Sequence, residues 1–147
     1  MTVRLVAPPR RRDVPAFDRA LLRRRASRAL EALGQRGSEL SVALVDDAAM
    51  AELNAAHRGK AGPTDVLSFS LLEGAHAEQR GALLGDVVIA LGVASRQARR
   101  GRRSLDDEIA RLLIHGVLHL VGHDHERDDE ARRMRAEERR LWKAVRP

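Results

Sequence analysis

Four of the six histidines in this chain lie within eleven residues, HGVLHLVGHDH (115–125). His115 and His119 are four residues apart, so on a helix their side chains project from the same face, one turn above the other. Two neutral imidazoles in this arrangement can bind one divalent ion, with nitrogen-to-zinc distances of about 2.0–2.1 Å. The spacing therefore predicts a pair of metal ligands on a helix.

A third ligand, His125, is predicted in the turn that follows this helix. On a straight helix it would lie out of reach of the ion, but Gly122 can adopt the left-handed conformation that ends a helix and turns the chain back. Three histidines leave a fourth position for water, which is typical of a catalytic zinc site. His123 or Asp124 could instead supply a fourth ligand, as in structural zinc sites, or could orient another ligand.

The spacing H-x-x-x-H-x-x-G-x-x-H is also that of metzincin proteases, so a zinc metallopeptidase is an alternative. Those proteases have a glutamate directly after the first histidine as general base, whereas this chain has Gly116. A ligand frame without this base indicates a different reaction at a similar metal site.

Hydrophobic periodicity and turn residues predict the elements that must position these ligands. Strands are predicted at 3–7, 39–45, 65–71 and 85–91. Helices are predicted at 13–34, from 46 or 47 to about 57, from about 93 to 101, from about 105 to 121, and from about 128 to 145. The helix that carries His115 and His119 is apolar on nearly all sides, so we expect it to be buried. We therefore predict a single α+β domain over residues 1–147, in which about five helices pack on a mixed sheet of about four strands and a central buried helix carries the metal ligands.

Composition narrows the function classes. The chain has no cysteine, which excludes disulfides, thiolate metal sites and cysteine nucleophiles. It has neither a run of about 18 apolar residues nor the apolar region of a secretory signal, so we expect a cytoplasmic protein without a membrane partner. Residues 1–36 carry ten arginines against three acids, in a chain of net charge +6, which favours nucleic acid as partner. Aromatic residues make up only 2% of the chain, which argues against a surface built from many base-stacking side chains.

Three sequence blocks, taken in order, resemble one known family. HGVLHLVGHDHE (115–126) resembles the signature of the YbeY family, bacterial single-domain endoribonucleases implicated in ribosomal RNA maturation and ribosome quality control. LNAAHRGKAGPTDVLSFS (53–70) and LGDVVIAL (84–91) resemble two further blocks of that family in order and spacing. The match runs from about Glu39 to Glu126, and the segments on either side agree with the family only in type.

The resemblance implies roles for four residues. His115, His119 and His125 match the three zinc ligands of the family, and Arg58 matches an arginine that the family needs for activity. A guanidinium can bind a phosphate bidentately and stays charged throughout a reaction. Arg58 is predicted in a glycine-containing loop before a strand, a place where functional residues are common.

The resemblance also implies a reaction, a substrate and partners. The reaction is cleavage of single-stranded RNA, including processing of the 3′ end of 16S rRNA, with the small ribosomal subunit and its assembly factors as partners. One zinc ion with three histidines and a water could polarise a phosphate oxygen or lower the pKa of the water. Attack by zinc-bound hydroxide and attack by the 2′-hydroxyl of the RNA both fit the sequence, which assigns no general base. We expect Asp65 to cap or form a salt bridge with Arg58, and Asp86 to orient a ligand histidine. A non-catalytic RNA-binding assembly factor with a structural metal is a further alternative.

Overall fold

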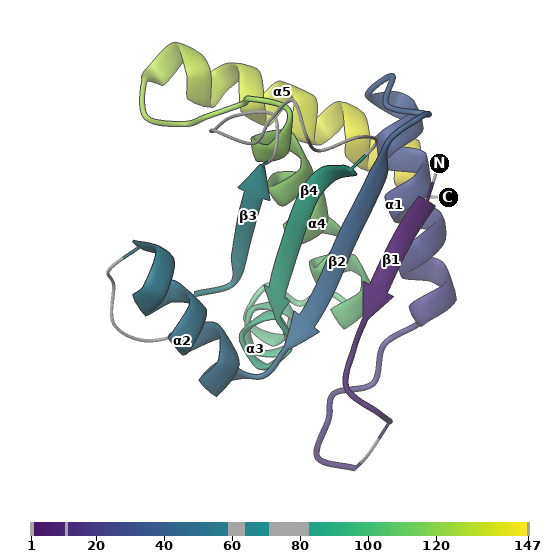
Figure 1. The fold of residues 1–147 in the computed structure, drawn as a ribbon, viewed down its shortest axis with the longest axis vertical. Helices are drawn as coiled ribbons and strands as arrows, with labels where there is room; N and C mark the ends of the chain where they lie inside the picture. Colours follow the sequence, from purple (N-terminus) through teal and green to yellow (C-terminus); the bar gives the residue numbers. More distant parts are fainter. Residues whose placement is uncertain (1, 11, 59–63, 71–82, 147) are drawn as a thin grey trace.

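The computed structural model describes residues 2–10, 12–58, 64–70 and 83–146. In these ranges, four strands and five helices follow one another along the chain (Figure 1). They are β1 (Thr2–Val6), α1 (Arg19–Ala32), β2 (Glu39–Val45), α2 (Asp47–Arg58), β3 (Val66–Ser70), β4 (Leu83–Ala90), α3 (Leu91–Arg100), α4 (Leu105–Leu120) and α5 (Asp128–Val145). The predicted α+β class is confirmed.

The four strands form one mixed sheet in the order β1-β2-β4-β3. β1, β2 and β4 run parallel, with Leu5 opposite Val42 and Val42 opposite Val87. β3 pairs with β4 in the antiparallel direction. Parallel neighbours need a crossover connection, which α1 provides between β1 and β2. The predicted mixed sheet is therefore also confirmed.

Helices cover both faces of this sheet. Leu40 and Val42 of β2 point into the larger core, which α1, α3 and α4 cover, because every second residue of a strand faces the same side. On the opposite face, Met50 of α2 packs against Leu67 and Val88. Figure 1 shows α4 passing behind the sheet and α5 lying across the end of the molecule where α4 ends.

α4 is the central buried helix that its apolar sequence predicts. The hydroxyl of Ser104 accepts a hydrogen bond from the N–H of Asp107 at 3.1 Å, which caps the first turn. Further along, Met134 of α5 packs with Ile114 and Leu118 of α4 in a second core cluster, so α5 lies beside the half of α4 that carries the histidines. Although α4 is apolar, none of the helices in the described ranges has both the length and the apolar character needed to cross a membrane.

The largest difference from the predicted elements concerns α1, which begins at Arg19 instead of residue 13. The helix starts there because the carboxylate of Asp18 accepts a hydrogen bond from the N–H of Leu21 at 3.0 Å and caps it. Val14 and Phe17 still pack against the core, but from irregular backbone. Their apolar spacing was therefore a sign of burial and not of helix.

Candidate metal centre

The C-terminal half of α4 places two histidines side by side. The rings of His115 and His119 lie with their centroids 4.7 Å apart, and their Nε2 atoms are separated by 3.2 Å. Four-residue spacing on a helix produces this proximity. Both side chains are partly buried, so their nitrogens converge at the edge of the core.

The turn after α4 brings in His125. Gly122 has a φ of +100°, the left-handed conformation predicted for this position, and its N–H donates to the carbonyl of His119 at 3.1 Å. The carboxylate of Asp124 accepts a hydrogen bond from the backbone N–H of His125 at 2.7 Å. As a result the ring of His125 lies with its centroid 5.8 Å from that of His115 and 5.4 Å from that of His119.

These three histidines fit a divalent ion. One ring nitrogen from each lies within 4.8 Å of the others. Two nitrogens bound to tetrahedral zinc at about 2.0–2.1 Å are about 3.3 Å apart, and the Nε2 atoms of His115 and His119 meet that separation at 3.2 Å. His125 is exposed, which leaves one side of the group open to solvent and to a substrate.

The surroundings of His119 favour its neutral form, which is the form that binds metal. Burial lowers the pKa of His119, and positive charge on His115 and His125 would lower it further. Asp124 acts in the opposite direction but more weakly. His119 therefore stays available as a ligand at neutral pH.

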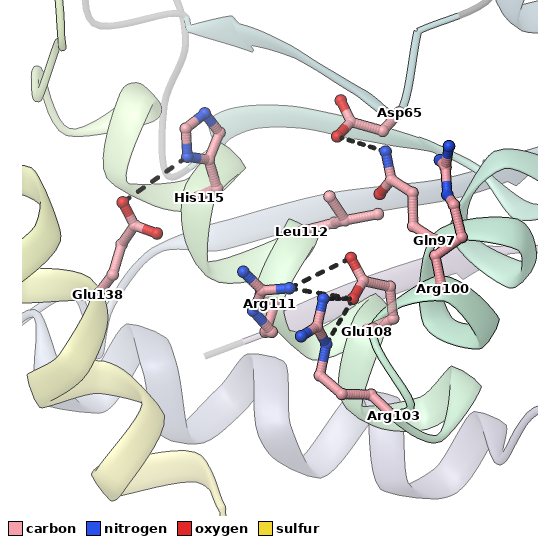
Figure 2. A pocket seen from close by; sticks show the side chains of 10 residues that line it. Asp65, Gln97, Arg100, Arg103, Glu108, Arg111, Leu112, His115 and Glu138 are labelled. Carbon is pink, nitrogen blue, oxygen red and sulfur yellow. Dashed lines mark hydrogen bonds and ion pairs between the residues drawn. The ribbon is translucent and has the colours of Figure 1, made fainter.

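Helix α5 places a carboxylate against the first histidine. Oε1 of Glu138 lies 3.9 Å from Nδ1 of His115, at the edge of a pocket (Figure 2). Interaction with the His115 ring lowers the pKa of Glu138 and outweighs burial, which acts in the opposite direction. A carboxylate in this position favours the tautomer of His115 that carries its proton on Nδ1 and offers Nε2 to a metal. Nothing in the sequence distinguishes Glu138, because it is one of many charged residues on α5 and only the packing of α5 on α4 brings it to His115.

Gly116 is enclosed by the sheet. A Cβ atom at this position would lie 2.8 Å from Cγ1 of Val87 and 3.1 Å from Oγ of Ser68. The Ser68 hydroxyl donates a hydrogen bond to the carbonyl oxygen of Gly116 at 2.9 Å, which holds α4 close to β3. The place where a metzincin has its glutamate therefore faces strands β3 and β4, with no room for a side chain.

Three further residues had predicted roles at the site: Asp65, Asp86 and Arg58. Asp65 binds its neighbour's backbone, accepting from the N–H of Val66 at 2.8 Å, and also contacts the side-chain amide of Gln97 at 3.3 Å. Among the described residues, Asp86 forms no hydrogen bond to a ligand histidine, so Glu138 occupies the position expected of it. α2 extends through Arg58, which therefore ends a helix instead of lying in a loop, and its side chain is outside the described part of the structure.

A pocket of about 510 Å³ opens beside His115 (Figure 2). Its wall carries three arginines, Arg100, Arg103 and Arg111. The carboxylate of Glu108, only 3% exposed, accepts hydrogen bonds from Nε of Arg103 at 2.9 Å and from Nη1 of Arg111 at 3.0 Å. Glu108 thus fixes two guanidinium groups at the wall, where their remaining N–H groups suit an anionic ligand.

Known proteins resemble this chain over nearly all of its length. The sequence profile of the family described as Endoribonuclease YbeY matches residues 12–146. The Endoribonuclease YbeY of Anaeromyxobacter sp. (strain Fw109-5) is 48% identical over 145 residues, which cover 98% of this chain and 72% of that protein. The Endoribonuclease YbeY of Geobacter metallireducens is 43% identical over 123 residues, 82% of each chain. A Thermotoga maritima protein whose structure was solved in solution superposes with a TM-score of 0.64 at 26% identity, covering 97% of this chain and 88% of its own.

Proposed function

This chain belongs to the YbeY family of endoribonucleases, and we propose that it is a metal-dependent hydrolase that cleaves single-stranded RNA during ribosomal RNA maturation. The observation that carries this proposal is the convergence of His115, His119 and His125, with two Nε2 atoms at a separation that fits one metal ion. Three ligands and an exposed side are typical of a catalytic rather than a structural zinc site.

We take zinc as the ion that the three histidines hold, because imidazole nitrogens in this number and spacing suit it. When bound, the ion supplies positive charge that stabilises the negative charge developing on the phosphate. The chain's own residues contribute the rest. Glu138 orients His115 through Nδ1, and burial keeps His119 neutral.

Arg58 is proposed as the catalytic cation that binds the scissile phosphate. The argument rests on its match to the arginine that the family needs for activity and on the bidentate geometry of a guanidinium. Arg58 ends α2 directly before residues 59–63 and β3, so it stands where a helix meets a connecting segment, and functional residues are common at such places.

The proposed substrate is the precursor of 16S rRNA at its 3′ end, with the small ribosomal subunit and its assembly factors as partners and the cytoplasm as compartment. Membership of the family also leads us to propose a role in ribosome quality control. The net charge of +6 supports a polyanionic substrate.

Cleavage of an end-labelled single-stranded RNA tests this function. Purified protein is compared with His115→Ala and Arg58→Ala proteins prepared in the same way, after circular dichroism has shown that all three are folded. We expect the unmodified protein to cut and both variants to lose at least about 100-fold in rate, since each loses electrostatic stabilisation of the transition state. If all three proteins cut the RNA equally, the activity comes from a contaminating nuclease and the proposed function is contradicted.

Two rival functions give different results. A metallopeptidase would cleave peptides and lose that activity on replacement of His119, but the enclosed position of Gly116 leaves no room for the usual glutamate base. A non-catalytic assembly factor would keep its cellular function after Arg58→Ala, whereas the nuclease would lose it.

A further inference from the structure

A second pocket lies between α4 and α5, next to the metal centre. It has a volume of about 300 Å³ and is lined by Arg111, Ile114, Arg135, Glu138, Arg139 and Trp142. Arg111 and Glu138 also line the pocket beside His115, so the two pockets adjoin. We call the second pocket the α4–α5 groove. A ligand bound at the histidines can continue into this groove without leaving the protein surface.

The charge of the α4–α5 groove is positive. Arg135 and Arg139 are exposed, and neither forms an ion pair with any acid in the described part of the chain. Arg111 is fixed through Nη1 by the buried Glu108, which leaves the rest of its guanidinium available. The only acid in the lining, Glu138, faces His115. The groove therefore offers guanidinium groups to an anionic ligand, and phosphate suits their fork geometry.

The groove also contains the only tryptophan of the chain, Trp142. Its ring packs against the core cluster that joins α4 and α5, and the guanidinium carbon of Arg25 lies 5.6 Å from the ring centroid. Arg25 thus covers one face of the ring, and the part of the ring that lines the groove is what remains for a ligand. On α5, Arg135, Arg139 and Trp142 follow the spacing i, i+4, i+7, so they lie along one face over about 10 Å.

We propose that the α4–α5 groove binds the part of a single-stranded RNA that flanks the scissile phosphate, with a base stacked on Trp142 and phosphates on Arg135 and Arg139. The proposal rests on the proposed nuclease function, because it extends the RNA path from the three histidines. An aromatic ring beside unpaired arginines is the arrangement by which proteins bind single-stranded nucleic acid without strong sequence preference. An acidic peptide would satisfy the arginines, but its acidic side chains would not stack on Trp142.

Intrinsic fluorescence tests the site directly, since the chain has one tryptophan and no tyrosine. The probe is a 2′-O-methyl oligoadenylate of about eight nucleotides, which the enzyme cannot cleave through a 2′-hydroxyl. Stacking of adenine on Trp142 should quench the emission in a saturable way. Binding of a labelled probe, seen by anisotropy, without a change in tryptophan emission would place the RNA elsewhere and overturn the proposal. Equal quenching by a polyglutamate peptide of the same length would overturn the assignment to RNA.

Variants identify the residues that bind the probe. Arg135→Gln with Arg139→Gln should weaken probe binding and lower the slope of log affinity against log salt by about 1.4, or about 0.7 for each phosphate that the protein no longer neutralises. Arg23→Gln with Arg24→Gln removes the same charge from exposed residues of the arginine-rich segment 1–36, the other basic region of the chain, and shows whether the probe binds there instead of in the groove. Trp142→Leu should weaken binding by about 5-fold to 150-fold, and Trp142→Phe should restore most of the affinity. If both arginine pairs weaken probe binding equally, or if Trp142→Leu does not weaken it, RNA binding in the groove is contradicted.

The cleavage assay separates failure of this proposal from failure of the nuclease function. If the protein cuts RNA and the groove variants bind and cut it equally well, RNA binding in the groove is overturned, whereas the nuclease function is supported. If the probe binds at Trp142 as described but the protein cuts no RNA, the groove is supported as an RNA site and the nuclease function fails.

Discussion

The carboxylate of Glu138 lies 3.9 Å from Nδ1 of His115, while Nε2 of the same ring lies 3.2 Å from Nε2 of His119. The His115 ring therefore faces Glu138 with its Nδ1 atom and His119 with its Nε2 atom. Both histidines lie on α4, and the packing of this helix holds their Nε2 atoms in place. Glu138 comes from α5. The contact between α4 and α5 thus contributes to the geometry of the metal centre as well as to the core.

Glu138→Gln should weaken zinc binding by about 10-fold to 100-fold, since partners that orient a ligand histidine have effects of this size. Competition with a chromophoric zinc chelator measures the affinity. Glu137→Gln is the matched control, because the neighbouring Glu137 carboxylate forms its ion pair with Arg140. Equal affinities for the two variants would show that Glu138 has no part in the metal centre.

Gly116→Glu should destabilise the folded protein by about 3 kcal/mol or more, because its side chain would meet Val87 and would place a carboxylate against the sheet. Urea unfolding of the metal-free protein measures the free energy. At Gly37 a Cβ atom would meet nothing within 4 Å, so Gly37→Glu should stay within about 0.5 kcal/mol of the unmodified protein. A Gly116→Glu protein as stable as the unmodified one would contradict the enclosed position of Gly116.

Glu108→Gln should lower the free energy of unfolding by about 1–3 kcal/mol, because it removes the buried anion that holds Arg103 and Arg111 together. Both arginines are partly exposed, which limits the destabilisation. The control is Glu31→Gln, whose ion pair with Arg36 is exposed on both sides and should contribute less than about 1 kcal/mol. If both variants lower the free energy of unfolding by similar amounts, burial of Glu108 does not strengthen its contribution to stability.

The metal-free protein should lose stability as the pH falls below about 6.5. The pKa of His119 is lowered in the folded state by burial and by its histidine neighbours, so the unfolded chain binds this proton more readily. Stability therefore rises with pH through this window and is fully present above it. Urea unfolding at a series of pH values should show a smaller pH dependence for His119→Gln. An unchanged dependence in that variant would contradict the role of His119.

Much of the metal centre could be predicted because its determinants are local. The spacing of His115 and His119 fixes their shared face on any helix, and Gly122 supplies the turn that returns His125. Glu138 could not be predicted, since it lies 23 residues after His115 in sequence and its position depends on how α5 packs against α4. The groove at Trp142 depends on the same packing.

The strands and helices were predictable where apolar periodicity and turn residues agreed. β2 matches its predicted range of 39–45, and α5 matches its range of 128–145. α1 was predicted too long, because apolar spacing at Val14 and Phe17 is the same for a helix and for an irregular segment that packs on the core. The capping contact of Asp18 decides where the helix begins.

Removal and return of the metal tests most directly whether the three histidines hold a catalytic ion. The protein is stripped with a chelator, and cleavage of single-stranded RNA is measured before and after addition of one equivalent of zinc, in parallel with His119→Ala. We expect loss of cleavage in the stripped protein, recovery with zinc, and no recovery in the variant. Undiminished cleavage by the stripped protein, with its metal content shown to be negligible, would contradict a metal-dependent nuclease at these three histidines.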